Sequence, residues 1–414
     1  MRLLHLLQWL GSSHRPPLAQ YGIPSPSAPG LAPESIRSVL WVRTDAIGDA
    51  VLAMDQLRVL GQAFPGAGIH VVCQENVAEL YRACPWAASV LPFERRRFRR
   101  DRRYRAGLLA AVRALAPDLA LNGVYSRETL TDALTLGSGA GIRCAWAGSR
   151  ERAAAWKLAL AERFYTHVFA GRPEGLELDR NRAFLVRLGL DPTGYAPRVW
   201  LAPEDRAFAQ AWMRDHGLDG AATVVLFAGA LKDVRHYGGF GQALALAFPG
   251  RQATLLALGA AADRERNQQA LEAYGGPSVN ACGATTLRQA AALIQGCRLA
   301  VGAETGLMHL AAAVGTPHAV VLGGGHFGRF APCSPLTSAA CLPLSCYGCD
   351  WRCPYARAHC VAEVPPGTLA RAIRDAWAGP DAQARLYRPQ ALPALPAGGP
   401  APAEPPAPPG SAWR

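Results

Sequence analysis

Short apolar runs alternate with segments of helical periodicity along most of this chain, and this alternation limits the folds that it can adopt. Runs of this length are typical of parallel strands buried on both faces, and the helical segments between them supply the crossovers that parallel strands need. The chain is therefore predicted to form an α/β structure with two doubly wound, Rossmann-like domains. The predicted strands lie at 39–42, 69–73, 89–91, 118–122 and 142–146, and then at 223–228, 253–258, 298–302 and 318–322.

Proline-rich segments at both ends and in the middle set the predicted domain boundaries. With 414 residues, of which 50% are hydrophobic, the chain is long enough for two ordinary domains and is not globally disordered. The predicted organisation is a disordered leader at 1–35, one domain at 36–190, a second at 191–378, and a disordered Pro/Ala-rich tail at 379–414.

The charge of the chain favours an anionic partner. The formal net charge is +12, and eight of the eleven residues from Arg95 to Arg105 are arginine. The run is either a solvated basic helix face or a contact for a phosphorylated or lipid-linked acceptor or for the anionic inner-membrane surface. Nucleic acid is not expected, because Phe98 and Tyr104 are the only aromatic residues within the run and no nucleic-acid-binding motif accompanies it.

No apolar run reaches the roughly 20 residues that a membrane span requires. The apolar stretch at the N-terminus is too short and too polar for a signal peptide. A cytoplasmic protein is therefore predicted, one that also contacts the cytoplasmic face of the inner membrane. Leucines at helical spacing in residues 3–10 leave two interpretations open, a short interfacial anchor and a frayed leader.

Five of the eleven cysteines cluster near the C-terminus, with the spacing C-x4-C-x2-C-x3-C-x6-C. A C-x2-C pair with further cysteines nearby is compatible with zinc or an iron–sulfur cluster, but the spacing fits neither pattern well. Reduced or partly paired thiols are therefore expected, with a structural metal as the alternative. The cysteines are Cys341, Cys346, Cys349, Cys353 and Cys360.

Three stretches carry residues suited to chemistry at strand ends. In RTDAIGDAVL (43–52), Gly48 allows a turn and Asp49 falls at or next to the N-cap of the following helix, as a cap or as a general base. A carboxylate there repels phosphate. In FAGALKDVRHYGGF (227–240), Gly229 allows close backbone approach, and Lys232 and Arg235 are either phosphate ligands or part of a solvated basic loop.

The third stretch is VGAETGLMHLAAAVGTP (301–317). Glu304, Thr305 and Gly306 offer a carboxylate, a hydroxyl and free backbone N–H groups at a strand end, a set that suits ribose hydroxyls and a diphosphate. His309 follows in the helix. The alternative to a ligand-binding turn is an ordinary capped helix in which His309 is a core or surface residue.

The three stretches in this order resemble the family-9 glycosyltransferases, the ADP-heptose:lipopolysaccharide heptosyltransferases and their relatives. The resemblance covers roughly residues 36–378. It implies a GT-B fold with two Rossmann-like domains facing across a cleft, the first binding mainly the acceptor and the second mainly the nucleotide sugar, with no required metal cofactor.

Carried onto this sequence, the resemblance implies a catalytic base at Asp49 and donor contacts from Gly229, Lys232, Arg235, Glu304, Thr305, Gly306 and His309. The residues expected to bind the acceptor are Arg43, Asp45 and Gly48, together with Arg99 and Arg102 of the arginine run. Two departures affect the donor: Arg235 stands where the family usually has lysine, with Tyr237 in the aromatic position, and Glu304 stands where the family has aspartate.

The predicted activity is an inverting transfer of a heptose or related sugar from a nucleoside-diphosphate sugar to an anionic glycolipid or saccharide acceptor. A rival interpretation, an NAD-dependent oxidoreductase, requires a G-x-G-x-x-G turn after the first strand, which TDAIGDA lacks. The second rival is a non-catalytic, redox-sensing or metal-binding protein on the same scaffold, favoured if Glu304 or the loop at 230–231 abolished donor binding.

Overall fold

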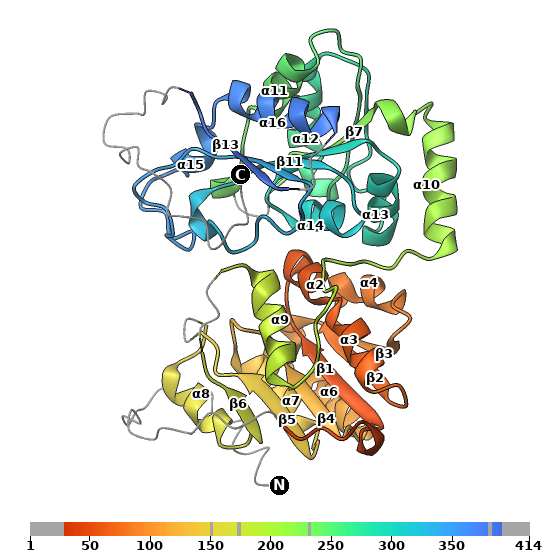
Figure 1. Cartoon of the computed structure of the whole chain (residues 1–414), viewed down its shortest axis with the longest axis vertical. Helices are drawn as coiled ribbons and strands as arrows, with labels where there is room; N and C mark the ends of the chain where they lie inside the picture. Colours follow the sequence, from red (N-terminus) through yellow and green to blue (C-terminus); the bar gives the residue numbers. More distant parts are fainter. Residues whose placement is uncertain (1–28, 150–151, 172–174, 231–232, 380–382, 391–414) are drawn as a thin grey trace. The chain divides into compact units, whose positions relative to one another are not determined.

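The structure is a computed structural model that describes residues 29–149, 152–171, 175–230, 233–379 and 383–390 (Figure 1). The chain divides into two compact units, each built around one parallel β-sheet, which confirms the predicted α/β class with two Rossmann-like domains. The first unit consists of Met1–Glu174 and Asp179–Tyr195, and the second of Gly175–Leu178 and Ala196–Arg414.

The first unit holds a six-stranded sheet in the order β3-β2-β1-β4-β5-β6, with every neighbouring pair parallel. The elements up to the end of its helix α9 are η1 (Pro33–Ser35), β1 (Ser38–Arg43), α2 (Ile47–Ala53), α3 (Gln56–Ala63), β2 (Gly68–Gln74), η2 (Glu75–Val77), α4 (Ala78–Arg82), β3 (Ala87–Phe93), α5 (Arg95–Arg100), α6 (Arg102–Ala114), β4 (Leu119–Asn122), α7 (Thr129–Gly137), β5 (Ile142–Trp146), α8 (Ala155–Glu162), β6 (His167–Phe169) and α9 (Glu177–Arg187).

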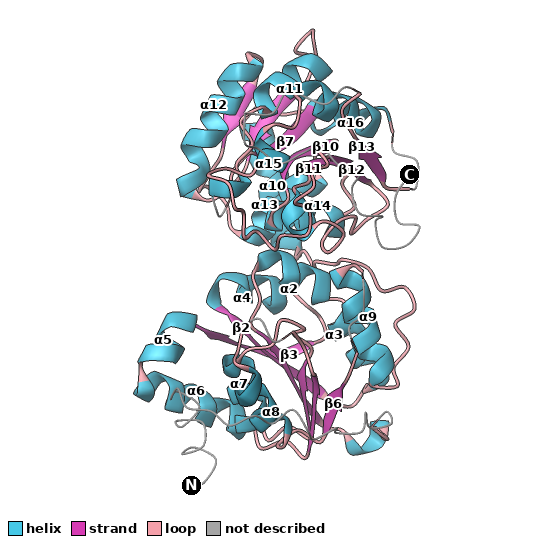
Figure 2. Ribbon diagram, turned by 90° about the vertical axis from the view of Figure 1, so that its left-hand side faces the viewer, coloured by secondary structure: helices cyan, strands magenta, loops and turns pink. Residues whose placement is uncertain are grey.

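Helices cover both faces of this sheet (Figure 2). The side chains of β1 alternate between the two faces, as in any strand. Leu40 and Val42 belong to a buried cluster with residues of α5, α6 and α7. On the opposite face Trp41 donates a hydrogen bond to Gln56 of α3 at 3.0 Å and meets the ring of Tyr81 of α4 edge-on. Burial on both faces explains why β1 is a continuous apolar run.

The second unit holds a seven-stranded parallel sheet in the order β13-β12-β11-β10-β7-β8-β9. Its elements are α10 (Pro203–Asp215), η3 (Gly220–Ala222), β7 (Thr223–Phe227), η4 (Asp233–Arg235), α11 (Phe240–Ala247), β8 (Thr254–Ala257), η5 (Ala261–Asp263), α12 (Arg264–Tyr274), β9 (Ser278–Asn280), α13 (Leu287–Gln295), β10 (Leu299–Ala303), α14 (Gly306–Ala313), β11 (His318–Val321), η6 (Gly324–His326), β12 (Thr337–Ala340), α15 (His359–Ala362), α16 (Pro366–Ala378) and β13 (Arg385–Tyr387).

The main core of the second unit lies between its sheet and the helices α11, α12 and α16. Phe240, Leu271 and Ile373 come from these three helices and share one buried cluster with strand residues such as Leu226 and Val301. The helices α13 and α14 cover the other face, and α10 packs on α13 (Figure 1).

Two segments that were expected to be disordered contain structure. Pro33–Ser35 form a 3-10 helix, whereas residues 1–28 of the predicted leader lie outside the described residues. The prediction of no structure from 379 onward is wrong for Arg385–Tyr387, which pair in parallel with β12. A three-residue edge strand carries no periodic signal of its own, and its pairing depends on the neighbouring strand.

Both sheets have a topological switch point, where the chain reverses the direction in which it adds strands. In the first unit this point lies between β1 and β4, and in the second between β7 and β10. Open parallel sheets bind ligands in the crevice outside the carboxyl ends of these two strands. The loops that leave these four strands are therefore the places to look for a site.

Candidate functional site

The loops after β7 and β10 leave adjacent strands of the second sheet, because Phe227 of β7 is paired with Gly302 of β10. The loop after β7 contains the predicted phosphate ligands, and the turn after β10 contains Glu304 and Thr305. The structure therefore brings two of the three predicted stretches to one switch point.

Gly229 begins the loop after β7 in a position that admits no side chain. A Cβ there would overlap the carboxyl group of Asp263, and the preceding Ala228 N–H donates to Asn267 of α12 at 3.0 Å. The glycine thus lets the loop backbone lie directly on the start of α12, as close approach requires. Of the two predicted cations, Lys232 lies outside the described residues.

Arg235, the other cation, lies in η4 and is half-buried. The carbon of its guanidinium is 4.3 Å from the ring centroid of Trp351. Tyr237, two residues later, is buried and meets the Phe240 ring edge-on. Burial raises the pKa of the Tyr237 hydroxyl above its usual value, so that the group is a neutral phenol at physiological pH.

The turn after β10 exposes the start of α14. Thr305 is the N-cap with an extended backbone, and its hydroxyl makes no capping hydrogen bond. The N–H groups of the first helical turn, from Gly306 onward, have no partner within the helix and carry the positive end of its dipole. Half-buried Glu304 precedes them directly. A carboxylate, a hydroxyl and helix N–H groups thus occupy one short turn.

His309 lies one turn further along α14 and is buried. Burial, and then the nearby His318, lower the pKa of His309 to about 3, so that the imidazole is neutral at physiological pH. Its Nδ1 has no hydrogen-bond partner among the residues that the structure describes. A buried polar nitrogen of this kind needs explaining, and a ligand or water at the switch point would supply its partner.

In the first unit, the loop after β1 differs from the prediction. Helix α2 begins at Ile47 with Ala46 as its N-cap, so that Gly48 is helical and Asp49 is the third residue of the helix. The prediction that Gly48 makes the turn and that Asp49 lies at or next to the N-cap is therefore wrong. The carboxylate of Asp49 still lies in the first helical turn, where the helix dipole stabilises a negative charge.

Side chains from elsewhere hold this loop in place of a glycine turn. Gln74, at the end of β2, donates to the carbonyl oxygens of Thr44 at 2.8 Å and Asp45 at 2.7 Å. Arg95 of α5 donates to the same Thr44 carbonyl at 2.5 Å and to Glu128 at 2.6 Å. Strand β2, helix α5 and the loop before α7 therefore fix the backbone that leads into Asp49.

Arg43 and Asp45, both predicted to bind the acceptor, form an ion pair with each other. Arg43 is 1% exposed and its Nε lies 2.6 Å from a carboxylate oxygen of Asp45, which is itself 10% exposed. The guanidinium also donates to the carbonyl of Gly123, just after β4, at 3.1 Å. Arg43 therefore links the two loops of the first switch point, a structural role that leaves it little surface for a ligand.

The arginine run forms two helices, α5 and α6, separated by Asp101, which accepts a hydrogen bond from Tyr104 N at 2.9 Å as the N-cap of α6. Arg99, predicted to bind the acceptor, pairs with Glu128 at 2.9 Å. Arg102 is exposed at the start of α6. Within the run, the exposed arginines that have no ion partner among the described residues are Arg96, Arg100, Arg102 and Arg103.

Comparison with known proteins relates this site to a family. Residues 136–355, more than half of the chain, match the family described as glycosyltransferase family 9 (heptosyltransferase). The chain belongs to glycosyltransferase family 9. The matched region includes both loops of the second switch point, whereas the loop at Asp49 lies outside it. Among curated proteins, none matched the sequence.

Solved structures of family-9 and related enzymes share the fold. A family-9 glycosyl transferase from Veillonella parvula is 20% identical with a TM-score of 0.64, covering 73% of this chain and 85% of its own. The ADP-heptose lipopolysaccharide heptosyltransferase II of E. coli is 18% identical with a TM-score of 0.63, covering 82% and 98%. E. coli heptosyltransferase WaaC, solved with ADP-2-deoxy-2-fluoro heptose, is 22% identical with a TM-score of 0.54, covering 69% and 89%.

The predicted family is thereby confirmed, together with the GT-B class and the assignment of the chain as a glycosyltransferase. Family membership also decides against the oxidoreductase interpretation. No helix in the described part of the chain has the length and hydropathy needed to span a bilayer.

The cysteine-rich segment of this family-9 protein contains no disulfide among the residues that the structure describes. Among the described residues, no three His, Cys, Asp or Glu side chains form a group that could hold an ion, and all eleven cysteines are free thiols. Burial raises the pKa of Cys360 to about 12, and burial with neighbouring thiols also raises that of Cys346.

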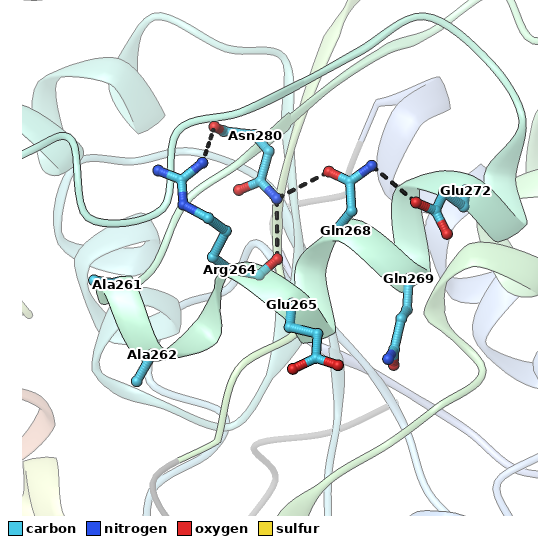
Figure 3. Close-up of a pocket in the computed structure, with 8 residues that line it drawn as sticks. All are labelled: Ala261, Ala262, Arg264, Glu265, Gln268, Gln269, Glu272 and Asn280. Atoms are coloured by element: carbon cyan, nitrogen blue, oxygen red, sulfur yellow. Dashed lines mark hydrogen bonds between the residues drawn. The ribbon is translucent and has the colours of Figure 1, made fainter.

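A polar hollow lies along α12 and at the end of the edge strand β9 (Figure 3). Its side chains satisfy one another: Asn280 donates to Gln268 at 3.2 Å and to the Arg264 carbonyl at 3.0 Å, and Gln268 donates to Glu272 at 3.1 Å. We therefore assign the candidate donor site of the glycosyltransferase to the loops after β7 and β10 and not to this hollow.

Sequence reasoning missed four residues that shape these loops. Gln74 and Arg95 hold the loop before Asp49, Asp263 lies against Gly229, and Trp351 lies over Arg235. Arg95 lies in the arginine run and Trp351 lies in the cysteine-rich segment, but neither was predicted to shape a loop of the site. Nothing in the local pattern of Gln74 or Asp263 distinguishes them, since their partners are distant in sequence.

Proposed function

We propose that this glycosyltransferase transfers a heptose or related sugar from a nucleoside-diphosphate sugar, such as ADP-heptose, to a lipopolysaccharide-core or other surface-polysaccharide acceptor. One observation supports the proposed binding of the nucleotide-sugar donor. The loop with Arg235 and the turn with Glu304 and Thr305 leave adjacent strands at a topological switch point. A cation, a carboxylate and helix N–H groups in such a position suit a diphosphate linked to a ribose.

Each of these groups has a chemical task in the proposal. The Glu304 carboxylate accepts hydrogen bonds from ribose hydroxyls, and the first N–H groups of α14 with the Thr305 hydroxyl bind phosphate oxygens. Arg235 adds a planar cation that pairs with phosphate in bidentate fashion. Glutamate is one methylene longer than the aspartate that is usual in the family.

The proposed reaction is a single displacement that inverts the anomeric carbon. The acceptor hydroxyl oxygen attacks the anomeric carbon as the bond from that carbon to the diphosphate oxygen breaks, and the nucleoside diphosphate departs with the bonding electrons. Asp49 takes the proton of the attacking hydroxyl as general base. Two observations support Asp49 as the base: it lies in the first turn of α2, and hydrogen bonds fix the loop that precedes it.

The departing diphosphate gains negative charge, which Arg235 and the N-terminus of α14 stabilise. Because these protein groups supply the positive charge, we propose that the reaction requires no divalent metal ion. Undiminished turnover in excess EDTA is the expected result. Loss of turnover that added Mg²⁺ restores would contradict it.

The exposed arginines of α5 and α6 support an anionic partner for the first unit. A phosphorylated or lipid-linked acceptor, or the cytoplasmic face of the inner membrane, matches a surface with four arginines that have no ion partner among the described residues. We propose a cytoplasmic enzyme that works at the membrane surface on such an acceptor, with no role for nucleic acid.

A thermal-shift panel of ADP-, GDP-, UDP- and dTDP-sugars tests the donor half. One nucleotide class should raise the Tm of the wild type, and Arg235→Gln should remove most of that shift. Arg214→Gln, at an exposed arginine of α10, is the matched control and should behave as the wild type. No shift with any donor, or an undiminished shift in Arg235→Gln, would contradict the proposal.

A further inference from the structure

The cysteine-rich segment 341–360 is bound to the glycine loop that follows β11. Gly348 N–H donates to the Gly324 carbonyl at 2.8 Å, and Asp350 N–H donates to the Gly325 carbonyl at 2.9 Å. In return, Gly324 N–H donates to the sulfur of Cys360 at 3.3 Å. Main-chain bonds and one thiol therefore fix the segment on the carboxyl side of β11, the strand next to β10.

The ring of Trp351 rests directly on this loop. A Cβ at Gly323 would lie 2.5 Å from Trp351 Cη2, and a Cβ at Gly325 would overlap the indole. Asp350 and Trp351 both have left-handed backbone conformations, with φ of 51° and 59°. Such conformations are rare for residues with side chains and persist where the surroundings impose them. Two glycines and a strained turn thus serve to place one tryptophan ring.

That ring carries the guanidinium of Arg235 at 4.3 Å from its centroid. A guanidinium stacks through its flat face and binds anions through the N–H donors at its edge, so stacking and anion binding use different parts of the group. A lysine ammonium has no flat face and would gain less from the ring. The tryptophan therefore restricts an otherwise flexible side chain to an orientation in which it can still bind phosphate in bidentate fashion.

We propose that Trp351 is a positioning residue for Arg235, and that the cysteine-rich segment acts as a clip that holds the ring in place. The clip explains why this chain carries arginine where lysine is usual, because a planar cation gains more from the ring than an ammonium does. This inference rests on the proposed function of Arg235 in binding the donor diphosphate.

A double-mutant cycle tests the coupling between the two side chains. The probes are ADP, GDP, UDP and dTDP, with the corresponding free nucleosides as phosphate-free references, and the measurement is the Kd by calorimetry. Trp351→Leu should weaken the preferred diphosphate about ten-fold and leave its nucleoside unchanged. Arg235→Lys should weaken diphosphate binding in the wild type but add little in the Trp351→Leu background.

Two further variants separate positioning from folding. Trp351→Phe keeps a ring face and should retain most of the diphosphate affinity. Tyr347→Leu is the matched control, because Tyr347 rests on Gly324 of the same loop. It should lower the Tm without changing diphosphate affinity. Should Trp351→Leu not fold, the cycle is run with Trp351→Phe, where a smaller coupling of the same sign is expected.

The outcomes distinguish this inference from the proposed function. Additive effects of the Trp351 and Arg235 substitutions, or an equal loss of nucleoside and diphosphate binding in Trp351→Leu, overturn the positioning role. Failure of every diphosphate to bind the wild type, or unchanged binding in Arg235→Gln, overturns the function on which it rests.

Discussion

Arg95 donates a hydrogen bond to the carbonyl oxygen of Thr44 across 2.5 Å, and so ties the loop after β1 to helix α5. The same guanidinium is held by Glu128, which also pairs with Arg99. The most conspicuous basic segment of the chain thus has two parts, arginines that build the loop before Asp49 and arginines that face solvent. The two parts predict different mutant phenotypes.

Arg95→Gln should reduce turnover by about ten- to a hundred-fold, because displacing a catalytic group by about 1 Å has costs of this order. Donor affinity, which we assign to the other unit, should remain unchanged. Arg96→Gln, at the exposed neighbouring position, is the matched control and should leave kcat as in the wild type. Equal kcat values for the two variants would show that the loop does not depend on Arg95.

Asp49→Asn should lower kcat by about 10²- to 10⁴-fold, the range expected when a general base is removed. Asparagine keeps the shape of the side chain in the first turn of α2, so the fold and the donor Kd should be preserved. Steady-state kinetics with calorimetry on the same preparation checks this. A folded variant with wild-type turnover would remove Asp49 from the role of base.

Burial of neutral His309 makes the stability of the second unit pH-dependent. The pKa of His309 is about 3 in the folded protein, below its ordinary value of about 6.5, so the unfolded chain binds the extra proton between these values. The contribution of His309 to the free energy of unfolding is therefore complete above pH 6.5. It is lost by about 1.4 kcal/mol per pH unit as the pH falls toward 3.

The difference in unfolding free energy between wild type and His309→Asn isolates this contribution. It should shrink by about 1.4 kcal/mol between pH 6 and pH 5 in urea titrations, because only the wild type can gain the proton at that position. His318, which also lowers the pKa of His309, is retained in both proteins. A constant difference across this range would mean that His309 is already solvated or protonated in the fold.

Replacing Arg96, Arg100 and Arg103 by glutamine should weaken binding to vesicles containing phosphatidylglycerol by about a hundred-fold or more, given about 1 kcal/mol per basic residue at an anionic surface. The binding of the wild type should fall with added salt. The control replaces three exposed arginines elsewhere, Arg187, Arg214 and Arg374, for the same change in charge. Equal weakening in both triple variants would indicate non-specific charge attraction.

The central strands of both sheets were predictable because parallel strands buried on both faces must be continuous apolar runs. The run 39–42 became β1, which is one residue longer at each end, and 318–322 became β11, which ends one residue earlier. The strands that sequence reasoning missed are short or rich in small residues. Strand β12 reads TSAA and is a strand because β11 pairs with it, a contact that no local pattern encodes.

The candidate site was predicted where a motif is contiguous. Glu304, Thr305 and Gly306 lie in one turn, and the chain itself brings them together at the start of α14. The turn before Asp49 was misjudged because the expected glycine is helical, and hydrogen bonds from Gln74 and Arg95 make the turn instead.

The two α/β units, the family and the residue types at the strand ends could be predicted from local sequence patterns, because buried strands and helix starts impose such patterns. Which strands are neighbours, and therefore which loops share a switch point, depends on contacts formed in the folded protein. The tertiary structure also decided that Arg43 is enclosed and that Trp351 lies over Arg235. Those relationships join residues far apart in the chain, and their energy comes from packing and hydrogen bonds that exist only after folding.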